Sequence, residues 1–161
     1  DSFRAAFGDE RADYAAAQRA HYEHGPPSGW ETSYVSAYAA MHAFEDFAET
    51  WAHYIHILDT LETASASALA LGARAITSPL PLDRGRPFAS ILADWAPLTV
   101  CLNQLNRSMG MRDAYPFAIT ERVVEKLGFV HDLCRDATTV AAERAALRAA
   151  AVATTPSSTL Q

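Results

Sequence analysis

The amino-acid sequence predicts one all-α domain. Apolar residues recur at the three- and four-residue spacing of amphipathic helices along most of the chain, and no segment alternates polar and apolar residues as a half-buried strand would. At 161 residues, with half of them apolar and a fifth charged, the chain is long enough to bury one hydrophobic core. We therefore expect a helical bundle of about six helices over residues 1–153, followed by a disordered tail over residues 154–161.

The first third of the chain is expected to hold three helical segments. Residues 2–7 predict the end of a helix, and Asp9 is a suitable cap for a second helix that ends at Gly25. The glycines and prolines of residues 25–30 cannot continue that helix. A third segment is expected over residues 33–41.

The rest of the chain supplies the longer helices. The longest pattern runs over residues 44–71, and the proline-containing residues 75–87 predict an irregular crossing over the surface. Helical spacing resumes at Phe88, and Pro97 is expected to restart the helix, because proline is tolerated in a first turn. The last two helical patterns share apolar or alanine-rich faces and cover residues 123–134 and 137–153.

Composition and charge exclude several classes of partner. The net charge is −6 and Lys126 is the single lysine, so the sequence lacks the basic patch that neutralises nucleic-acid phosphates or an anionic membrane surface. No apolar run approaches the ~18 residues that span a bilayer, and the first residues do not form a signal peptide, so we expect a cytoplasmic protein. Cys101 and Cys134 lie in apolar helical patterns without Cys-x-x-Cys spacing, which favours reduced core thiols.

The longest helical pattern carries a stripe of carboxylates and imidazoles. Because each residue advances about 100° around an α-helix, Glu45, Glu49, His53 and His56 fall within about 80° of one face. The flanks are apolar, and charged groups near a core must pair, bind a metal or face a cavity. The stripe can face solvent, or Glu49 and His53 can pair one turn apart. A third possibility, which fits better, is that its oxygen and nitrogen atoms bind a metal such as zinc or iron.

Several stretches of this sequence match a known pattern. Residues 36–39 are SAYA and residues 45–54 are EDFAETWAHY, and further matching stretches extend from about residue 3 to 134. The sequence resembles a bacterial family of zinc-binding metallopeptidases. The spacing from Tyr38 to Glu45, and the Glu-x-Phe-Ala-Glu pattern, are also distantly similar to the gluzincin-like zinc domain of anthrax lethal factor.

This resemblance implies roles for single residues. Glu45 is implied as the third zinc ligand and Tyr38 as the group that steadies the oxyanion of the tetrahedral intermediate. Glu49, with His53, is implied to support the ligands from behind. His42 is interpreted as structural or as a contact to substrate, and the remaining candidate side chains are His56 and Asp46.

The chain departs from the family in one important respect. Such enzymes have a His-Glu-x-x-His helix that supplies two histidine ligands and the general base, and this sequence has none. In the family that helix lies just upstream of the point matching residue 1, and the first residue is not methionine. We therefore expect the C-terminal part of a zincin-like catalytic domain, inactive as given. The resemblance implies zinc as the cofactor of the intact protein, a peptide or protein as its substrate, and the upstream segment of the same protein as a partner.

Two alternatives remain open, and two expectations lie outside the stripe. A non-catalytic helical module that binds a partner is the main alternative, and a carboxylate-bridged di-metal bundle ranks last because no Glu-x-x-His motif is found. Arg107 and Asp113 are expected to form a buried ion pair, whereas His21 and His24 are expected to be solvated.

Overall fold

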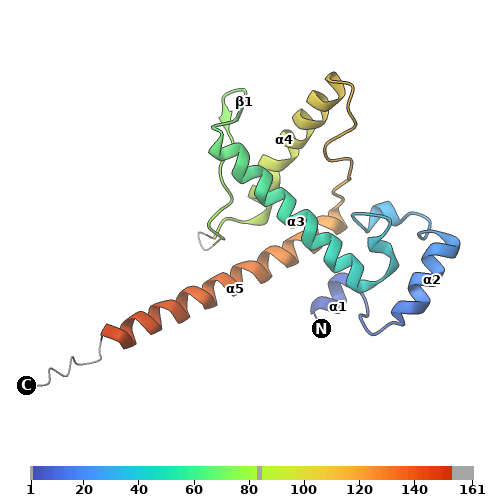
Figure 1. Ribbon diagram of the computed structural model, residues 1–161, viewed down its shortest axis with the longest axis horizontal. Coiled ribbons are helices and arrows are strands. Elements are labelled where there is room, and N and C mark those ends of the chain that lie inside the picture. Colours follow the sequence, from blue (N-terminus) through green and yellow to red (C-terminus); the bar gives the residue numbers. More distant parts are fainter. Residues whose placement is uncertain (1, 83–84, 154–161) are drawn as a thin grey trace, which may run out of the picture.

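The computed structural model describes residues 2–82 and 85–153, and it is all-α. Within these residues lie five α-helices, two 3₁₀ turns and one small hairpin (Figure 1). The elements in chain order are α1 (Ser2–Phe7), α2 (Tyr14–His24), η1 (Trp30–Thr32), η2 (Ala39–Met41), α3 (Ala43–Ala66), β1 (Ala70–Leu71), β2 (Arg74–Ala75), α4 (Phe88–Ser108) and α5 (Glu121–Ala153).

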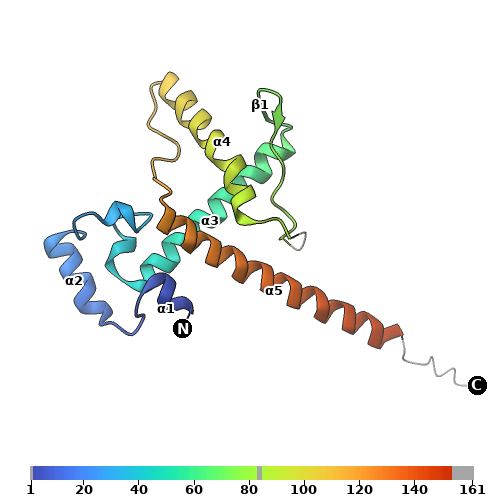
Figure 2. The same ribbon diagram turned by 180° about the vertical axis from the view of Figure 1, so that it is seen from behind.

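The central helix of the fold is α3. It crosses α5, and α1, η2 and α4 also pack against it (Figure 1). The largest fully buried apolar side chains come from the three long helices: Tyr54, Ile57 and Leu61 of α3, Ile91 and Leu98 of α4, and Val123, Leu127 and Val130 of α5. Both views show the C-terminal part of α5 extending away from the other helices (Figure 2). The core therefore lies around the middle of α3 and the first turns of α5.

The N-terminal elements differ in detail from the prediction. The first helix, α1, is confirmed, but α2 is capped by Asp13, whose side chain accepts a hydrogen bond from the N–H of Ala16 at 3.0 Å. Asp9 does not cap a helix because its carboxylate is bound by the side chain and N–H of Arg11. The predicted segment over residues 33–41 is wrong as a helix and consists of turns that end in η2.

The observed ends of the later helices also differ from the predicted ends. The central helix stops at Ala66, because Ala68 adopts a positive φ of 53° and the N–H of Leu69 bonds back to the carbonyl of Ala64. Pro97 does not restart a helix but lies inside the continuous α4. The two last predicted helices are one, α5. The predicted tail, residues 154–161, lies outside the described residues.

The irregular crossing between β2 and α4 is anchored on one buried carboxylate. Asp94 accepts hydrogen bonds from Arg74, Arg86 and Thr77, and it is only 1% exposed. Burial raises the pKa of Asp94, but the hydrogen bonds from Arg86 and Thr77 outweigh it and leave the pKa below its ordinary value. The crossing segment is thereby fixed to α4.

Two further predictions concern the cysteines and membrane-spanning helices. Cys101 and Cys134 are both free and half-buried. Among the helices of residues 2–82 and 85–153, none is both long and apolar enough to cross a membrane.

Candidate metal-binding site

The start of α3 is held in place by His42. Its Nδ1 accepts a hydrogen bond from the N–H of Phe44 at 3.1 Å, so the proton lies on Nε2, which donates to the carbonyl of Ala12 at 3.1 Å. The side chain is buried, with 6% exposure. Because both ring nitrogens are engaged, His42 is a helix cap that ties the segment before α2 to α3.

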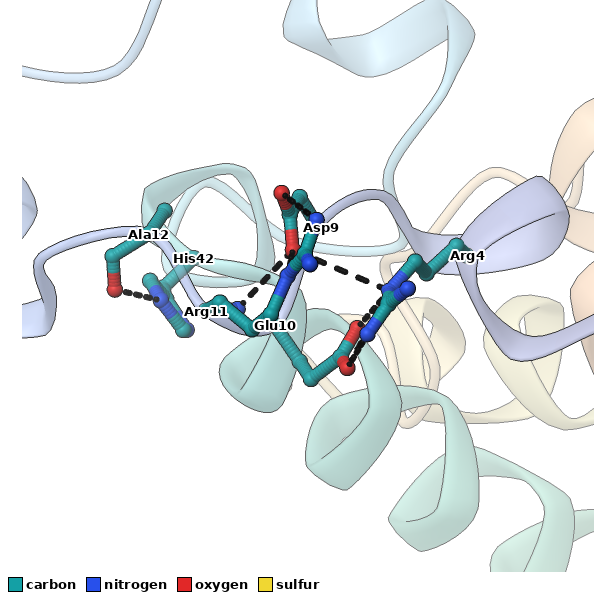
Figure 3. Close-up of polar contacts among 6 residues, drawn as sticks. All are labelled: Arg4, Asp9, Glu10, Arg11, Ala12 and His42. Atoms are coloured by element: carbon teal, nitrogen blue, oxygen red, sulfur yellow. Dashed lines mark hydrogen bonds and ion pairs between the residues drawn. The ribbon is translucent and has the colours of Figure 1, made fainter. Parts of the chain in front are cut away.

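Charged side chains also form contacts within the segment between α1 and α2 (Figure 3). Arg4 of α1 donates to the carboxylate of Glu10, with Nε 2.9 Å from Oε2, and Arg11 donates to Asp9 at 2.8 Å. These pairs are exposed or half-exposed, so each contributes little to stability alone. They link α1 to the residues just before Ala12, whose carbonyl His42 contacts.

Glu45 lies in the first turn of α3 and meets the first turn of α2. The hydroxyl of Tyr14 donates to Oε1 of Glu45 at 2.6 Å, and the carboxylate is half-buried. The Glu45 carboxylate, followed by the nearby Tyr38 hydroxyl and by burial, raises the pKa of the Tyr14 phenol. Tyr14 therefore remains a hydrogen-bond donor at neutral pH. Its hydroxyl lies close to both the Glu45 carboxylate and the Tyr38 hydroxyl.

Tyr38 has a second aromatic neighbour on α2. The ring of His21 stands perpendicular to the ring of Tyr38, with 6.0 Å between the ring centroids. His21 is half-buried, so its predicted solvation is wrong, whereas His24 is exposed as predicted. We call Tyr14, His21, Tyr38 and Glu45 the Tyr14–Glu45 cluster.

Glu49 supports the turn that carries Tyr38. The hydroxyl of Ser36 donates to Oε2 of Glu49 at 2.9 Å and accepts a hydrogen bond from the N–H of Ala39 at 3.0 Å. The side chain of Glu49, one helical turn after Glu45, thus fixes the segment that leads into η2. Glu49 and His53 form no ion pair and bond instead to Ser36 and Tyr115, so the alternative in which these two side chains pair with each other is wrong.

His53 and His56 continue the stripe along α3 to a pocket. Nδ1 of His53 hydrogen bonds with the hydroxyl of Tyr115 at 2.7 Å, and the imidazole packs against the ring of Phe117 at a centroid distance of 4.5 Å. Burial lowers the pKa of His53, which keeps the ring neutral at pH 7. Glu49, His53 and the exposed His56 all line one pocket of about 380 Å³.

Asp46, a further candidate, belongs to the fold. Its Oδ2 lies 2.6 Å from Nζ of Lys126 of α5, and both side chains are buried, at 1% and 3% exposure. Nζ also donates to the carbonyl of Ser33 at 2.6 Å and lies 4.2 Å from the ring centroid of Tyr34. Burial raises the pKa of Asp46 to about 6 against the opposing effect of Lys126, and burial lowers the pKa of Lys126. Asp46 therefore points to α5 and away from Glu45.

The Tyr14–Glu45 cluster is suited to provide one ligand of a metal site, not a complete set. In the described part of the chain no three His, Cys, Asp or Glu side chains converge to hold a metal ion. A zinc ion in a catalytic site takes three protein ligands and keeps one position open. Glu45 offers a carboxylate whose orientation is fixed by a hydrogen-bond donor, which is the chemistry of a carboxylate metal ligand.

Tyr14 and His21 were not predicted as site residues. The sequence held a signal, because both side chains fall on one face of the helix that follows the first glycine, and Tyr14 lies in one of the stretches that match the family pattern. Their proximity to Glu45 and Tyr38 depends on a long-range contact between α2 and η2, which periodicity does not reveal.

Comparison with known proteins agrees with the resemblance seen in the sequence. Residues 1–133 match a family described as "Putative zinc-binding metallo-peptidase". The chain is 48% identical over 129 residues to uncharacterised proteins of Mycobacterium bovis and of two Mycobacterium tuberculosis strains. These alignments cover 80% of this chain and 37% of each relative, so the chain spans about a third of the length of the relatives. No solved structure matches it. The match over most of its length shows that the chain belongs to this family.

Proposed function

We propose that this chain forms the part of a zinc-dependent peptidase that supplies Glu45 as one protein ligand of the metal. The observation that carries the proposal is the 2.6 Å hydrogen bond from Tyr14 to Oε1 of Glu45, beside Tyr38, in a chain of this family. The Glu45 carboxylate is half-buried in the first turn of α3, and the phenol of Tyr14 fixes its orientation.

The remaining ligands are assigned to an upstream segment of the same protein. We propose that a His-Glu-x-x-His helix contributes two histidines and the general base, since the described residues offer no such group. Zinc bound there supplies Lewis acidity toward a peptide carbonyl and toward the attacking water.

The residues of this chain then orient the metal ligand Glu45 and polarise the substrate carbonyl. Tyr14 fixes the carboxylate of Glu45, which removes rotamers that metal binding would otherwise have to restrict. Tyr38 donates its phenol proton to the oxyanion that develops on the substrate carbonyl. Glu49 holds the turn that carries Tyr38 through the Ser36 hydroxyl.

Hydrolysis by a protein that includes the upstream segment tests these roles. We expect Glu45→Gln to abolish hydrolysis of a casein substrate, and Tyr38→Phe to retain zinc while kcat falls by about 10²–10³. Glu62→Gln, an exposed carboxylate farther along α3, is the matched control and should be unaffected.

The outcomes separate this proposal from its alternative. A Tyr38→Phe variant with unchanged kcat would remove Tyr38 from the reaction. A protein that binds zinc fully and hydrolyses no peptide would instead support the non-catalytic helical module.

A further inference from the structure

Two adjoining pockets run along α3 beside α4. The first, of about 380 Å³, lies between the polar stripe of α3 and the aromatic side chains of Trp95, Tyr115 and Phe117. The second, of about 420 Å³, continues between the later turns of α3 and Leu98 of α4. Both are lined by Thr60 and Leu102, so the two pockets adjoin at these residues, and we call the pair the α3–α4 groove.

The length of the groove suits an extended chain. It follows α3 from Glu49 to Ser67, which is about 27 Å at 1.5 Å per helical residue. An extended peptide advances about 3.3 Å per residue, so about eight residues fit along it. The groove begins at Glu49, one helical turn after Glu45, so a peptide lying in it leads to the proposed metal ligand.

The lining of the groove is acidic and aromatic. Glu49 and Asp59 are its carboxylates, and neither arginine nor lysine lines it within the described part of the chain. Trp95 and Tyr115 form buried walls of the first pocket, and Phe117 is partly exposed at its side. Carboxylates along a groove attract a cationic partner, and aromatic walls favour a large apolar or aromatic side chain.

We propose that the α3–α4 groove binds an extended, basic peptide segment and seats one of its aromatic side chains in the first pocket, against Phe117. The segment is the substrate, and in this respect the inference rests on the proposed function. Glu49 and Asp59 face its lysine or arginine side chains, which sets a preference for basic sequences.

Binding to the 161-residue chain tests the groove without requiring zinc or catalysis. The probe is a short fluorescein-labelled peptide with one tryptophan flanked by lysines in a glycine–serine background, measured by fluorescence anisotropy. Matched peptides replace the lysines by glutamates or the tryptophan by serine. We expect binding of the first peptide alone, weakened by added salt because exposed charges are screened.

A pair of charge reversals on one helix locates the site. Asp59 and Glu62 are both exposed on α3, but only Asp59 lines the groove. Asp59→Lys is expected to weaken binding on the order of fivefold, as expected for a partly screened pair of charges, and Glu62→Lys to leave it unchanged. Equal effects of the two reversals would overturn the proposal.

Filling the junction of the two pockets provides a second, independent test. Thr60→Trp places a large side chain where the pockets meet and should abolish binding while circular dichroism shows the helices intact. Equal binding of the acidic and basic peptides, or binding of none of them, overturns the proposal. Dimers of the chain that Thr60→Trp dissociates would assign the groove to a second copy and also overturn it. Because every arm measures binding, a failed peptidase assay leaves these outcomes unchanged.

Discussion

The phenol of Tyr14 holds the carboxylate on which the proposed metal site depends. Tyr14→Phe removes the 2.6 Å hydrogen bond to Glu45 and leaves the ring in place. Loss of such a supporting bond weakens metal affinity by roughly tenfold. We expect that loss in competitive zinc titrations of a protein with the upstream segment. Tyr22→Phe, an exposed tyrosine on the same helix, should bind zinc normally, and equal affinities of the two variants would contradict the role of Tyr14.

The buried pair of Asp46 and Lys126 is important for stability. Lys126→Met leaves the carboxylate of Asp46 buried without its cation, which costs about 3–5 kcal/mol in the free energy of unfolding. Urea denaturation measures this loss. The double variant Asp46→Leu/Lys126→Met should recover most of it, because two apolar side chains need no partner. A loss below about 1 kcal/mol in the single variant would show that the pair is dispensable.

Two buried histidines contribute to the pH dependence of stability. His131 is buried with its Nδ1 bonded to the hydroxyl of Tyr54 and its Nε2 to the carbonyl of Arg86, and burial lowers its pKa. The unfolded chain, with an ordinary histidine pKa of about 6.5, therefore binds the proton first as the pH falls. The buried histidines, His131 and His53 alike, should therefore make the free energy of unfolding decrease as the pH falls below about 6.5. Asp46, whose pKa is raised to about 6, acts in the opposite direction over the same pH range.

Substitution of His131 measures how much this residue contributes to the pH dependence of the free energy of unfolding. His131→Gln should flatten the decrease in unfolding free energy between pH 7.5 and 5.5, measured by urea titration at each pH. An unchanged slope would mean that His131 has the same proton affinity in the folded and unfolded states.

Site residues close in sequence were predictable, and those joined by long-range contacts were not. The 100° periodicity placed Glu49, His53 and His56 on one face, and all three line one pocket. The contact of Tyr14 with Glu45 joins residues 31 positions apart, and it depends on how α2 packs. Arg107 and Asp113 pair as predicted, at 2.6 Å, but Arg107 is exposed, so the predicted burial is wrong.

At the level of the elements, Pro97 is the clearest departure from local preference. Proline lacks the N–H that would bond to the carbonyl four residues earlier, yet α4 continues through it from Phe88 to Ser108. Pro97→Ala restores the donor at an exposed position and should raise the free energy of unfolding by about 1–3 kcal/mol. Urea denaturation provides the measurement. A lower free energy of unfolding in the variant would show that the proline ring makes a stabilising contact.

Helix identity was predictable for the long elements because their apolar periodicity is local. Their ends were not. The last two helices merge because no glycine or proline separates Cys134 from residue 137, and alanine favours continuation. The end of α3 depends on Ala68, which adopts the positive φ that usually requires glycine. Because alanine rarely adopts this conformation, the turn at Ala68 could not be predicted from residue type.

At the scale of the whole molecule, α3 joins the parts that the proposed function needs. Its first turn carries Glu45, its middle contributes the core residues Tyr54 and Ile57, and its later turns line the α3–α4 groove. The single domain over residues 1–153 stays a prediction. The curated relatives are longer than the matched segment, and the activity of the whole protein is likewise proposed.

The zinc content of a protein that includes the upstream His-Glu-x-x-His segment tests the role of Glu45 most directly. Inductively coupled plasma mass spectrometry should find one zinc ion per molecule in the parent and in Glu62→Gln, and a loss of most of that zinc in Glu45→Gln. Retention of one zinc ion per molecule by Glu45→Gln would contradict the assignment of Glu45 as a metal ligand.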